Sequence, residues 1–117
     1  MKVGFIGLGN VGGKLASSLL RNKFDLTVID LDSSVTKDFL SKGASESNSP
    51  KELAEKVDLI ITCLPSPKIC SEVMEKKGGV IEGLSKNKIW LEMSTTDNKE
   101  VKRIGELVKL KGAIPLD

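Results

Sequence analysis

The sequence contains no histidine and no tyrosine, and it has only two cysteines, Cys63 and Cys70. Without histidine, neither a zinc site nor a histidine general base can be built, so we expect no metal and no such base. Two cysteines do not form a disulfide framework. Cys63 lies in the apolar run of residues 59–64, where a thiol is a small core residue, and Cys70 falls on the next predicted helix.

Aromatic residues make up only 3% of the chain, which leaves few side chains on which nucleic-acid bases can stack. The 18 basic and 16 acidic residues are scattered and give a net charge of +2, so electrostatics do not favour a nucleic-acid partner. No apolar run is long enough to span a membrane, and a strand predicted from residue 2 leaves no space for a signal peptide. We therefore expect a cytoplasmic protein without nucleic-acid or membrane partners.

Glycine is concentrated near the N-terminus, where three glycines follow the apolar residues 3–6 in the order G-x-G-x-x-G and precede a helical pattern. In a strand, turn and helix of this kind, Gly7 permits the sharp turn, Gly9 lets a pyrophosphate approach the backbone, and Gly12 lets helix and strand pack closely. The anion then faces the free N–H groups of the helix. We expect the segment to bind a dinucleotide through Gly7, Leu8, Gly9, Asn10, Val11 and Gly12, although a tight turn without a ligand uses glycines too.

An acidic residue ends the second predicted strand, residues 25–30. Asp30 stands about 20 residues beyond the glycines, where a carboxylate accepts hydrogen bonds from the adenosine ribose. A carboxylate there repels a 2′-phosphate, so NAD is favoured over NADP as the cofactor. Alternatively, Asp30 begins a loop or joins Asp32 in capping the following helix.

The remaining chain alternates between predicted helices and short apolar strands. We expect further strands over residues 44–46, 59–64, 88–93 and 113–116. Helices are expected from Asp32 to Gly43, after Ser49-Pro50, and from Ser66-Pro67 to Gly78-Gly79. A short helical turn is expected within 80–87. Asp97 and Glu100 predict a capping box for the last helix.

This alternation predicts one α/β domain over residues 1–117, a Rossmann-type doubly wound parallel sheet in the order 3-2-1-4-5-6 with helices on both faces. A ligand is then expected at the carboxyl ends of strands 1 and 4, where the winding direction reverses.

Several motifs together are similar to those of the β-hydroxyacid dehydrogenases, a family that includes 3-hydroxyisobutyrate dehydrogenase and the glyoxylate or succinic semialdehyde reductases. The matching motifs, in order, are the glycine segment, Ser49-Pro50, Asp58 with Ile-Ile-Thr-Cys-Leu-Pro65, Gly78-Gly79-Val80 and Met93-Ser-Thr-Thr-Asp97. The resemblance implies that Leu64, Pro65 and Thr95 contact the cofactor and that Ser94 lies near the substrate. Alternatively, Pro65 serves only to end a strand, and residues 94–96 serve only to help cap the next helix.

The chain departs from this family at several positions. Val11 stands where many members have methionine, and Ile69 replaces a polar residue that reaches the cofactor in several members. The family's substrate-binding glycine-rich segment, its catalytic lysine and its all-helical domain, which buries the substrate and joins subunits, are all expected beyond Asp117. We therefore assign no catalytic residue within 1–117, and we expect exposed apolar surface that favours self-association.

Two functions are open at this point. The chain is expected to be the cofactor-binding part of an NAD-dependent 3-hydroxyacid dehydrogenase, in which hydride passes between the nicotinamide and a small hydroxyacid or its semialdehyde. The alternative is a stand-alone NAD-sensing regulatory module without catalysis. Because such a module needs no Ser-Thr pair beside the nicotinamide, the Leu64-Pro65 and Ser94-Thr95 pairs favour the dehydrogenase.

Overall fold

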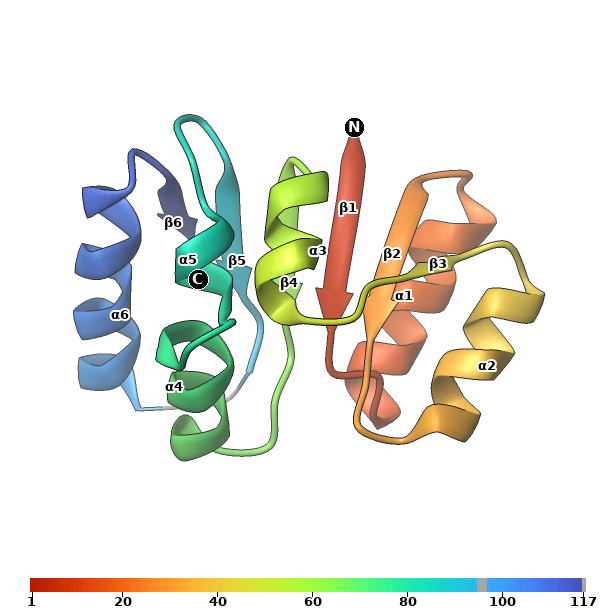
Figure 1. Cartoon of the computed structure of the whole chain (residues 1–117). Coiled ribbons are helices and arrows are strands. Elements are labelled where there is room, and N and C mark those ends of the chain that lie inside the picture. The colour runs from red at the N-terminus through yellow and green to blue at the C-terminus, as the bar shows by residue number, and fades with distance from the viewer. Residues whose placement is uncertain (95–96, 117) are drawn as a thin grey trace.

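A parallel β-sheet forms the centre of the molecule in the computed structural model, which describes residues 1–94 and 97–116 (Figure 1). Its six strands lie in the order β3-β2-β1-β4-β5-β6, as the sequence predicted. Their bounds are β1 Lys2–Ile6, β2 Asp25–Ile29, β3 Ser45–Glu46, β4 Leu59–Thr62, β5 Ile89–Glu92 and β6 Ile114–Leu116. Because β1 pairs with both β2 and β4, its carboxyl end lies where the strand order reverses.

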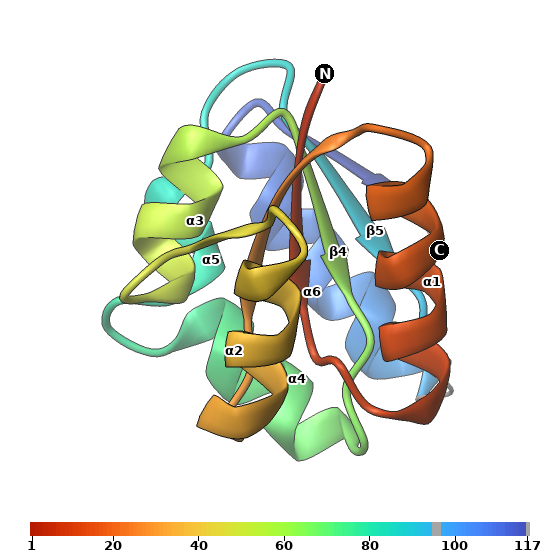
Figure 2. The ribbon, with the colours of Figure 1, turned by 90° about the vertical axis from the view of Figure 1, so that its right-hand side faces the viewer.

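Helices cover both faces of the sheet. Two of them, α1 Asn10–Arg21 and α2 Ser33–Ser41, pack on one face. The opposite face carries α3 Pro50–Lys56, α4 Pro67–Glu75, α5 Val80–Gly83 and α6 Asn98–Leu110. Figure 2 shows α1 on the side of the sheet away from α3 and α5, as right-handed crossovers on both sides of β1 require.

Most helices begin at a polar residue whose side chain caps the first turn. The hydroxyl of Ser49 accepts a hydrogen bond from the Glu52 amide at the start of α3, and the hydroxyl of Ser66 accepts one from Ile69 in α4. Both caps precede a proline at the first helical position, as the sequence predicted.

The cap of α6 differs from its prediction. Asp97 accepts a hydrogen bond from the Lys99 amide, so it caps the helix. The Glu100 carboxylate, however, bonds to Arg103 one turn further on, and the expected capping box is not closed. A cationic partner within reach on the same helix face therefore outcompetes the backbone amide.

The strands and helices are shorter than predicted at several ends. β4 was expected to reach Leu64 but ends at Thr62, which pairs with the last residue of β1, Ile6. Beyond this pair β1 turns away at Gly7, so the chain after Thr62 has no strand beside it. The helical turn expected within 80–87 is confined to α5. α4 ends at Glu75, three residues before Gly78.

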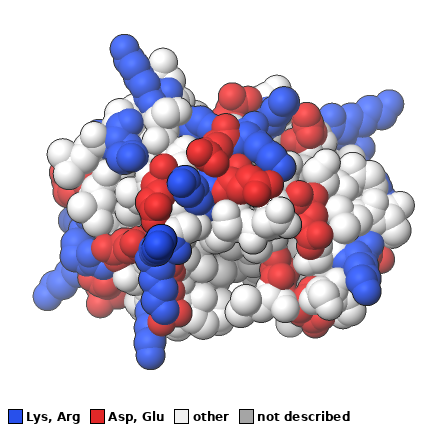
Figure 3. Space-filling model, in the orientation of Figure 1, with Lys and Arg blue, Asp and Glu red and all other residues white. Residues whose placement is uncertain are grey.

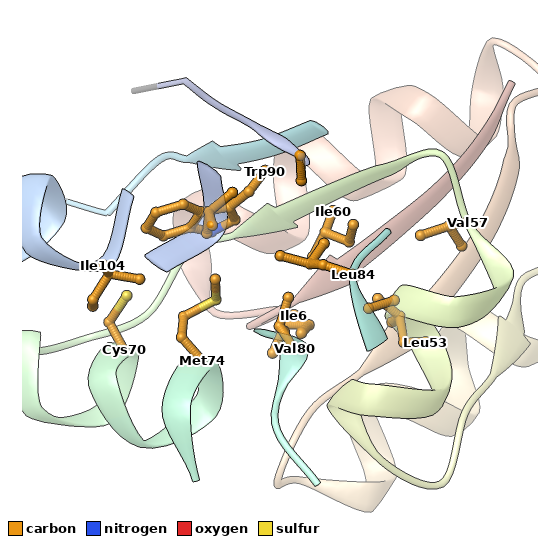
Figure 4. Packing of buried hydrophobic residues seen from close by; sticks show 13 residues of the cluster. Ile6, Leu53, Val57, Ile60, Cys70, Met74, Val80, Leu84, Trp90 and Ile104 are labelled. Carbon is orange, nitrogen blue, oxygen red and sulfur yellow. The ribbon is translucent and has the colours of Figure 1, made fainter. Parts of the chain in front are cut away.

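Two apolar clusters hold the layers together, one on each face of the sheet. Phe5 and Val28 lie against α1 and α2, whereas Ile60 and Trp90 lie against α3 to α6. Figure 4 shows that Met74 of α4 lies close to Trp90 and Ile60 in the second cluster. Trp90 is fully buried and is the only tryptophan, so its fluorescence reports on this face.

On the face shown in Figure 3, charged side chains of both signs are interspersed, and the lower centre of this face is largely uncharged. Among the residues that the structure describes, no helix has the length and hydropathy needed to cross a membrane.

Candidate functional site

The turn between β1 and α1 is built on two glycines that no other residue can replace without displacing the backbone. Gly7 has a positive φ of 99°, and a Cβ there would lie 2.2 Å from the carbonyl oxygen of Cys63. A Cβ on Gly12 would lie 2.2 Å from the carbonyl oxygen of Gly7. Gly9 is different, because a Cβ there would meet no atom within 4 Å. The structure of the turn thus depends on Gly7 and Gly12, whereas Gly9 leaves its surroundings open.

The first turn of α1 has free hydrogen-bonding capacity. Its N-cap residue is Gly9, which has no side chain to accept a bond from the first amides, and the first turn contains no acidic residue. A 12-residue helix that starts in this way presents N–H donors and the positive end of its dipole. These are the features that bind a phosphate group.

Asp30 lies directly after β2 and is joined to the glycine turn. Its Oδ2 accepts a hydrogen bond from the Leu8 amide at 2.6 Å, and its Oδ1 accepts one from the Asp32 amide at 2.8 Å. Each carboxylate oxygen has lone pairs for more than one donor, so both retain capacity for a ligand hydroxyl. Asp32, not Asp30, caps α2, because the Asp32 side chain accepts from the Ser34 amide.

A cleft of about 910 Å³ opens at the carboxyl ends of the strands. Most of the residues expected to bind the cofactor line it, namely Gly7, Gly9, Asn10, Val11, Gly12, Asp30, Leu64 and Pro65. Leu8 does not, since its side chain is buried between the sheet and α1 and only its backbone faces Asp30. Thr95 lies outside the described residues.

Ser94 is held close to the cleft without lining it. Its hydroxyl oxygen accepts a hydrogen bond from the Leu64 amide at 2.6 Å, which joins the segments that follow β4 and β5. The Leu64 amide is thereby occupied, so a ligand meets the side chain or the carbonyl of Leu64. Because the Ser94 hydroxyl acts as acceptor in this bond, its proton remains available for a further bond.

The structure adds residues to the cleft that the sequence did not single out as binding residues. The stretch from the end of β3 to the start of α3 contributes Glu46, Ser47, Asn48 and Pro50, and α4 contributes Ile69, Glu72 and Val73. Among the buried side-chain N and O atoms in the described parts of the chain, the Ser47 hydroxyl is the one that has no hydrogen-bond partner. A polar residue at the end of a strand beside Asp30 could have identified Ser47 from the sequence as a residue of the cleft. However, β3 has only two residues, so its sequence pattern is weak.

Cys63 was expected in the core, but it is only partly buried and lines the cleft. The chain leaves the sheet at Thr62, and this exposes one side of the cysteine. Burial, with a smaller contribution from the nearby negative charge of Glu92, raises the pKa of the Cys63 thiol. The thiol is therefore a weak nucleophile at neutral pH.

The charged side chains that line the described part of the cleft are acidic, and positive charge comes from the N-terminal end of α1. Asp30, Glu46 and Glu72 line the cleft, and no lysine or arginine does so among the residues described in the structure. The diphosphate of a dinucleotide would therefore rely on backbone N–H groups of the glycine turn and α1 for its charge. A 2′-phosphate near Asp30 would have no cationic side chain in the cleft to pair with it.

The described residues hold no group of three or more histidine, cysteine, aspartate or glutamate side chains placed to bind a metal ion. The glycine turn, the open helix end and the acid after β2 lie together at the reversal of strand order. These features define a nucleotide-binding domain of the doubly wound α/β class.

Comparison with known proteins gives the family. The family model described as the NAD binding domain of 6-phosphogluconate dehydrogenase matches residues 2–117, and the chain belongs to this family. The mitochondrial 3-hydroxyisobutyrate dehydrogenase of Mus musculus is 36% identical over 115 residues, which are 98% of this chain and 34% of that protein. Glyoxylate/succinic semialdehyde reductase 1 of Arabidopsis thaliana is 36% identical over 112 residues, 96% of this chain and 39% of that protein.

Solved structures share the fold at lower identity. A 3-hydroxyisobutyrate dehydrogenase from Salmonella typhimurium has a TM-score of 0.90 at 22% identity, and the match covers 98% of this chain and 40% of that one. Psf3 in complex with NADP⁺ and 2-OPP has a TM-score of 0.91 at 20% identity, covering 97% and 40% of the two chains. The chain thus spans between a third and two fifths of the length of these relatives.

Proposed function

We propose that this chain is the coenzyme-binding part of an NAD-dependent 3-hydroxyacid dehydrogenase. The observation that carries the proposal is the bond between the Leu8 amide and Asp30, which joins the glycine turn to the acid at the edge of one cleft. The relatives with 36% identity are named for activities on 3-hydroxyisobutyrate or on glyoxylate and succinic semialdehyde, which supports a small hydroxyacid or its semialdehyde as substrate.

The residues of the cleft fit a dinucleotide in three respects. Gly9 leaves open space where a side chain would stand, the first turn of α1 offers uncapped amides, and Ser47 holds a buried hydroxyl without a partner. In this proposal Asp30 binds the adenosine ribose, and residues Gly9 to Gly12 bind the diphosphate. Leu64, Pro65 and Thr95 contact the nicotinamide half.

Bound NAD supplies the hydride acceptor for oxidation of the hydroxyl-bearing carbon of the substrate. The residues of this chain bind and orient the cofactor, and the Ser94 hydroxyl donates a hydrogen bond to the substrate. A lysine outside residues 1–117 is expected to handle the substrate proton, and an all-helical domain to enclose the substrate. The chain alone is therefore expected to bind NAD and to catalyse nothing.

The preference for NAD over NADP is part of the proposal. It rests on the Asp30 carboxylate at the end of β2 and on the lack of basic side chains among the described residues that line the cleft. A 2′-phosphate placed beside Asp30 would meet negative charge without a compensating cation.

Titration with NADH and NADPH tests the proposal directly. Trp90 lies in β5 and bonds to Thr62 in β4, so it is close enough to the ends of both strands to transfer energy to a bound nicotinamide. We expect saturable quenching by NADH and a weaker response to NADPH. Absence of any saturable response would overturn coenzyme binding, and tighter binding of NADPH would overturn the role of Asp30.

A turnover assay separates the two functions that the sequence left open. The chain is mixed with NAD and 3-hydroxyisobutyrate, alone and joined to the following part of its reading frame if there is one. Turnover that appears only in the longer protein supports the dehydrogenase. Tight NAD binding by a longer protein without any turnover supports a regulatory module instead.

A further inference from the structure

A buried carboxylate lies behind the part of the cleft that is formed by β4 and β5. Glu92, the last residue of β5, is 4% exposed. Its Oε1 accepts a hydrogen bond from the Ser94 amide at 2.6 Å, and its Oε2 accepts from the Thr62 hydroxyl at 3.1 Å and the Cys70 thiol at 2.8 Å. Among the described residues no lysine or arginine forms an ion pair with it. The Glu92 carboxyl group is thus held by hydrogen bonds and not by an ion pair.

Both donors to Oε2 are restricted to donating. The Thr62 hydroxyl accepts a hydrogen bond from Nε1 of Trp90 at 2.9 Å, which directs its single proton toward Glu92. Burial and the bond to Glu92 raise the pKa of the Cys70 thiol, so the sulfur keeps its proton. An acceptor is therefore required at both carboxylate oxygens. A glutamine has only one acceptor oxygen, so its NH2 group would face either the two donors at Oε2 or the Ser94 amide at Oε1.

From Glu92 the contacts continue to the cleft. The carboxylate fixes the Ser94 amide, and the Ser94 hydroxyl in turn accepts from the amide of Leu64, which lines the cleft. On the other side Cys70 lies in α4, between the cleft residues Ile69 and Val73. One carboxylate therefore joins the ends of β4 and β5 and the start of α4, all of which border the same half of the cleft.

We propose that Glu92 is the positioning residue of the nicotinamide half of the coenzyme site. It holds Ser94, and through Ser94 it holds Leu64 at the place where Leu64 meets the coenzyme. This inference rests on the proposed function, in which Asp30 binds the adenosine ribose and α1 binds the diphosphate. The hydrogen bonds of Glu92 go to Thr62, Cys70 and Ser94 and to neither Asp30 nor α1, so we expect its effect on the part of the ligand beyond the diphosphate.

The variant Glu92→Gln tests this inference with two ligands that differ only in the nicotinamide. NADH uses the whole cleft, whereas ADP-ribose uses the adenosine and diphosphate part. We expect the Kd for NADH to rise about tenfold, because the loss of one hydrogen bond typically changes affinity by about this factor. The Kd for ADP-ribose should stay within about twofold. A folded variant in which both affinities fall equally, or in which neither changes, would overturn the proposal.

Two further comparisons keep the test decisive if Glu92→Gln does not fold. Ser94→Ala keeps the amide that bonds to Glu92 and removes only the acceptor for Leu64, so it should show the same selective loss of NADH affinity. Equal loss for both ligands, or no loss, would contradict the proposed chain of contacts. Cys70→Ser retains a donor to Glu92 and Cys70→Ala does not, so only the alanine variant should weaken NADH binding.

Binding of NADH and ADP-ribose to the wild-type protein shows whether a failed test contradicts this inference or the proposed function. If it binds neither NADH nor ADP-ribose, the proposed coenzyme site is wrong, and the role of Glu92 falls with it. If it binds both and Glu92→Gln leaves their ratio unchanged, the coenzyme site stands and only the positioning role is wrong.

Discussion

The Leu8 amide donates to Oδ2 of Asp30 at 2.6 Å, across 22 positions of sequence. The other carboxylate oxygen accepts from the Asp32 amide. Asp30 therefore has two tasks, because it fixes the glycine turn against the end of β2 and also presents its remaining lone pairs to the cleft. A residue that only bound a ribose would not need the first contact, and a residue that only fixed the turn would not need to face the cleft.

The variant Asp30→Asn should change both stability and coenzyme preference. Asparagine has one acceptor oxygen, so one of the two amides loses its partner, and we expect the free energy of unfolding to fall by about 1 kcal/mol. The Kd for NADH should rise about tenfold while that for NADPH changes less, because the charge that repels the 2′-phosphate is gone. Denaturant unfolding and fluorescence titration measure the two effects.

Asp32→Asn is the matched control for this experiment. Asp32 is exposed, caps α2 and does not line the cleft, so its replacement should leave the ratio of NADH to NADPH affinity unchanged. A similar shift of that ratio in both variants would mean that general surface charge, not the position of Asp30, selects the coenzyme.

Replacement by alanine should affect stability at Gly12 but not at Gly9. The new methyl group in Gly12→Ala would lie 2.2 Å from the Gly7 carbonyl oxygen, so we expect a loss of stability of at least about 2 kcal/mol. In Gly9→Ala the methyl group meets nothing within 4 Å, so the melting temperature should stay nearly unchanged.

The coenzyme affinity of Gly9→Ala distinguishes an anion site from a simple turn. A methyl group between the ligand and the bare amides should raise the Kd for NADH about tenfold or more, although the fold is intact. Unchanged affinity in a folded Gly9→Ala variant would show that the diphosphate does not lie over this turn.

Ser47→Ala should stabilise the free protein. The Ser47 hydroxyl is buried without a hydrogen-bond partner, and removing such a group should raise the free energy of unfolding by about 1 kcal/mol. Thermal unfolding should be compared with and without saturating NADH. A gain in melting temperature that disappears with NADH would show that the coenzyme satisfies the hydroxyl, whereas a loss without NADH would show that the hydroxyl already has a partner.

The sequence predicted the fold well because each of its signals is local. The glycine turn, the Ser49-Pro50 and Ser66-Pro67 helix starts and the alternating apolar runs each depend on neighbouring residues, and together they gave the strand order that the structure has. Ends of strands were predicted less well. Whether β4 continues past Thr62 depends on where β1 turns away, which is a property of a partner strand.

The candidate site was predictable only in its motif residues. Glu92 bonds to Thr62, Cys70 and Ser94, but the first two lie 30 and 22 positions away, and none of these residue types is unusual in a strand or helix. Ser47 similarly becomes notable only when burial removes its partners. Contacts between segments far apart in sequence require the fold, and the pattern of one chain does not contain them.

The two cysteines should differ in their reaction with N-ethylmaleimide. Burial raises the pKa of both thiols, so the thiolate fraction at a given pH is lower than for a free cysteine, and alkylation should accelerate only as the pH rises above neutrality.

Cys63 lines the cleft and is partly exposed, so it should react in the folded protein. Cys70 is 2% exposed and should react only on unfolding. The variants Cys63→Ala and Cys70→Ser, followed by mass spectrometry from pH 7 to 9, separate the two rates. NADH should slow the reaction of Cys63 in the Cys70→Ser variant, since coenzyme in the cleft covers the thiol, and labelling of Cys63 at an unchanged rate in saturating NADH would place the coenzyme elsewhere.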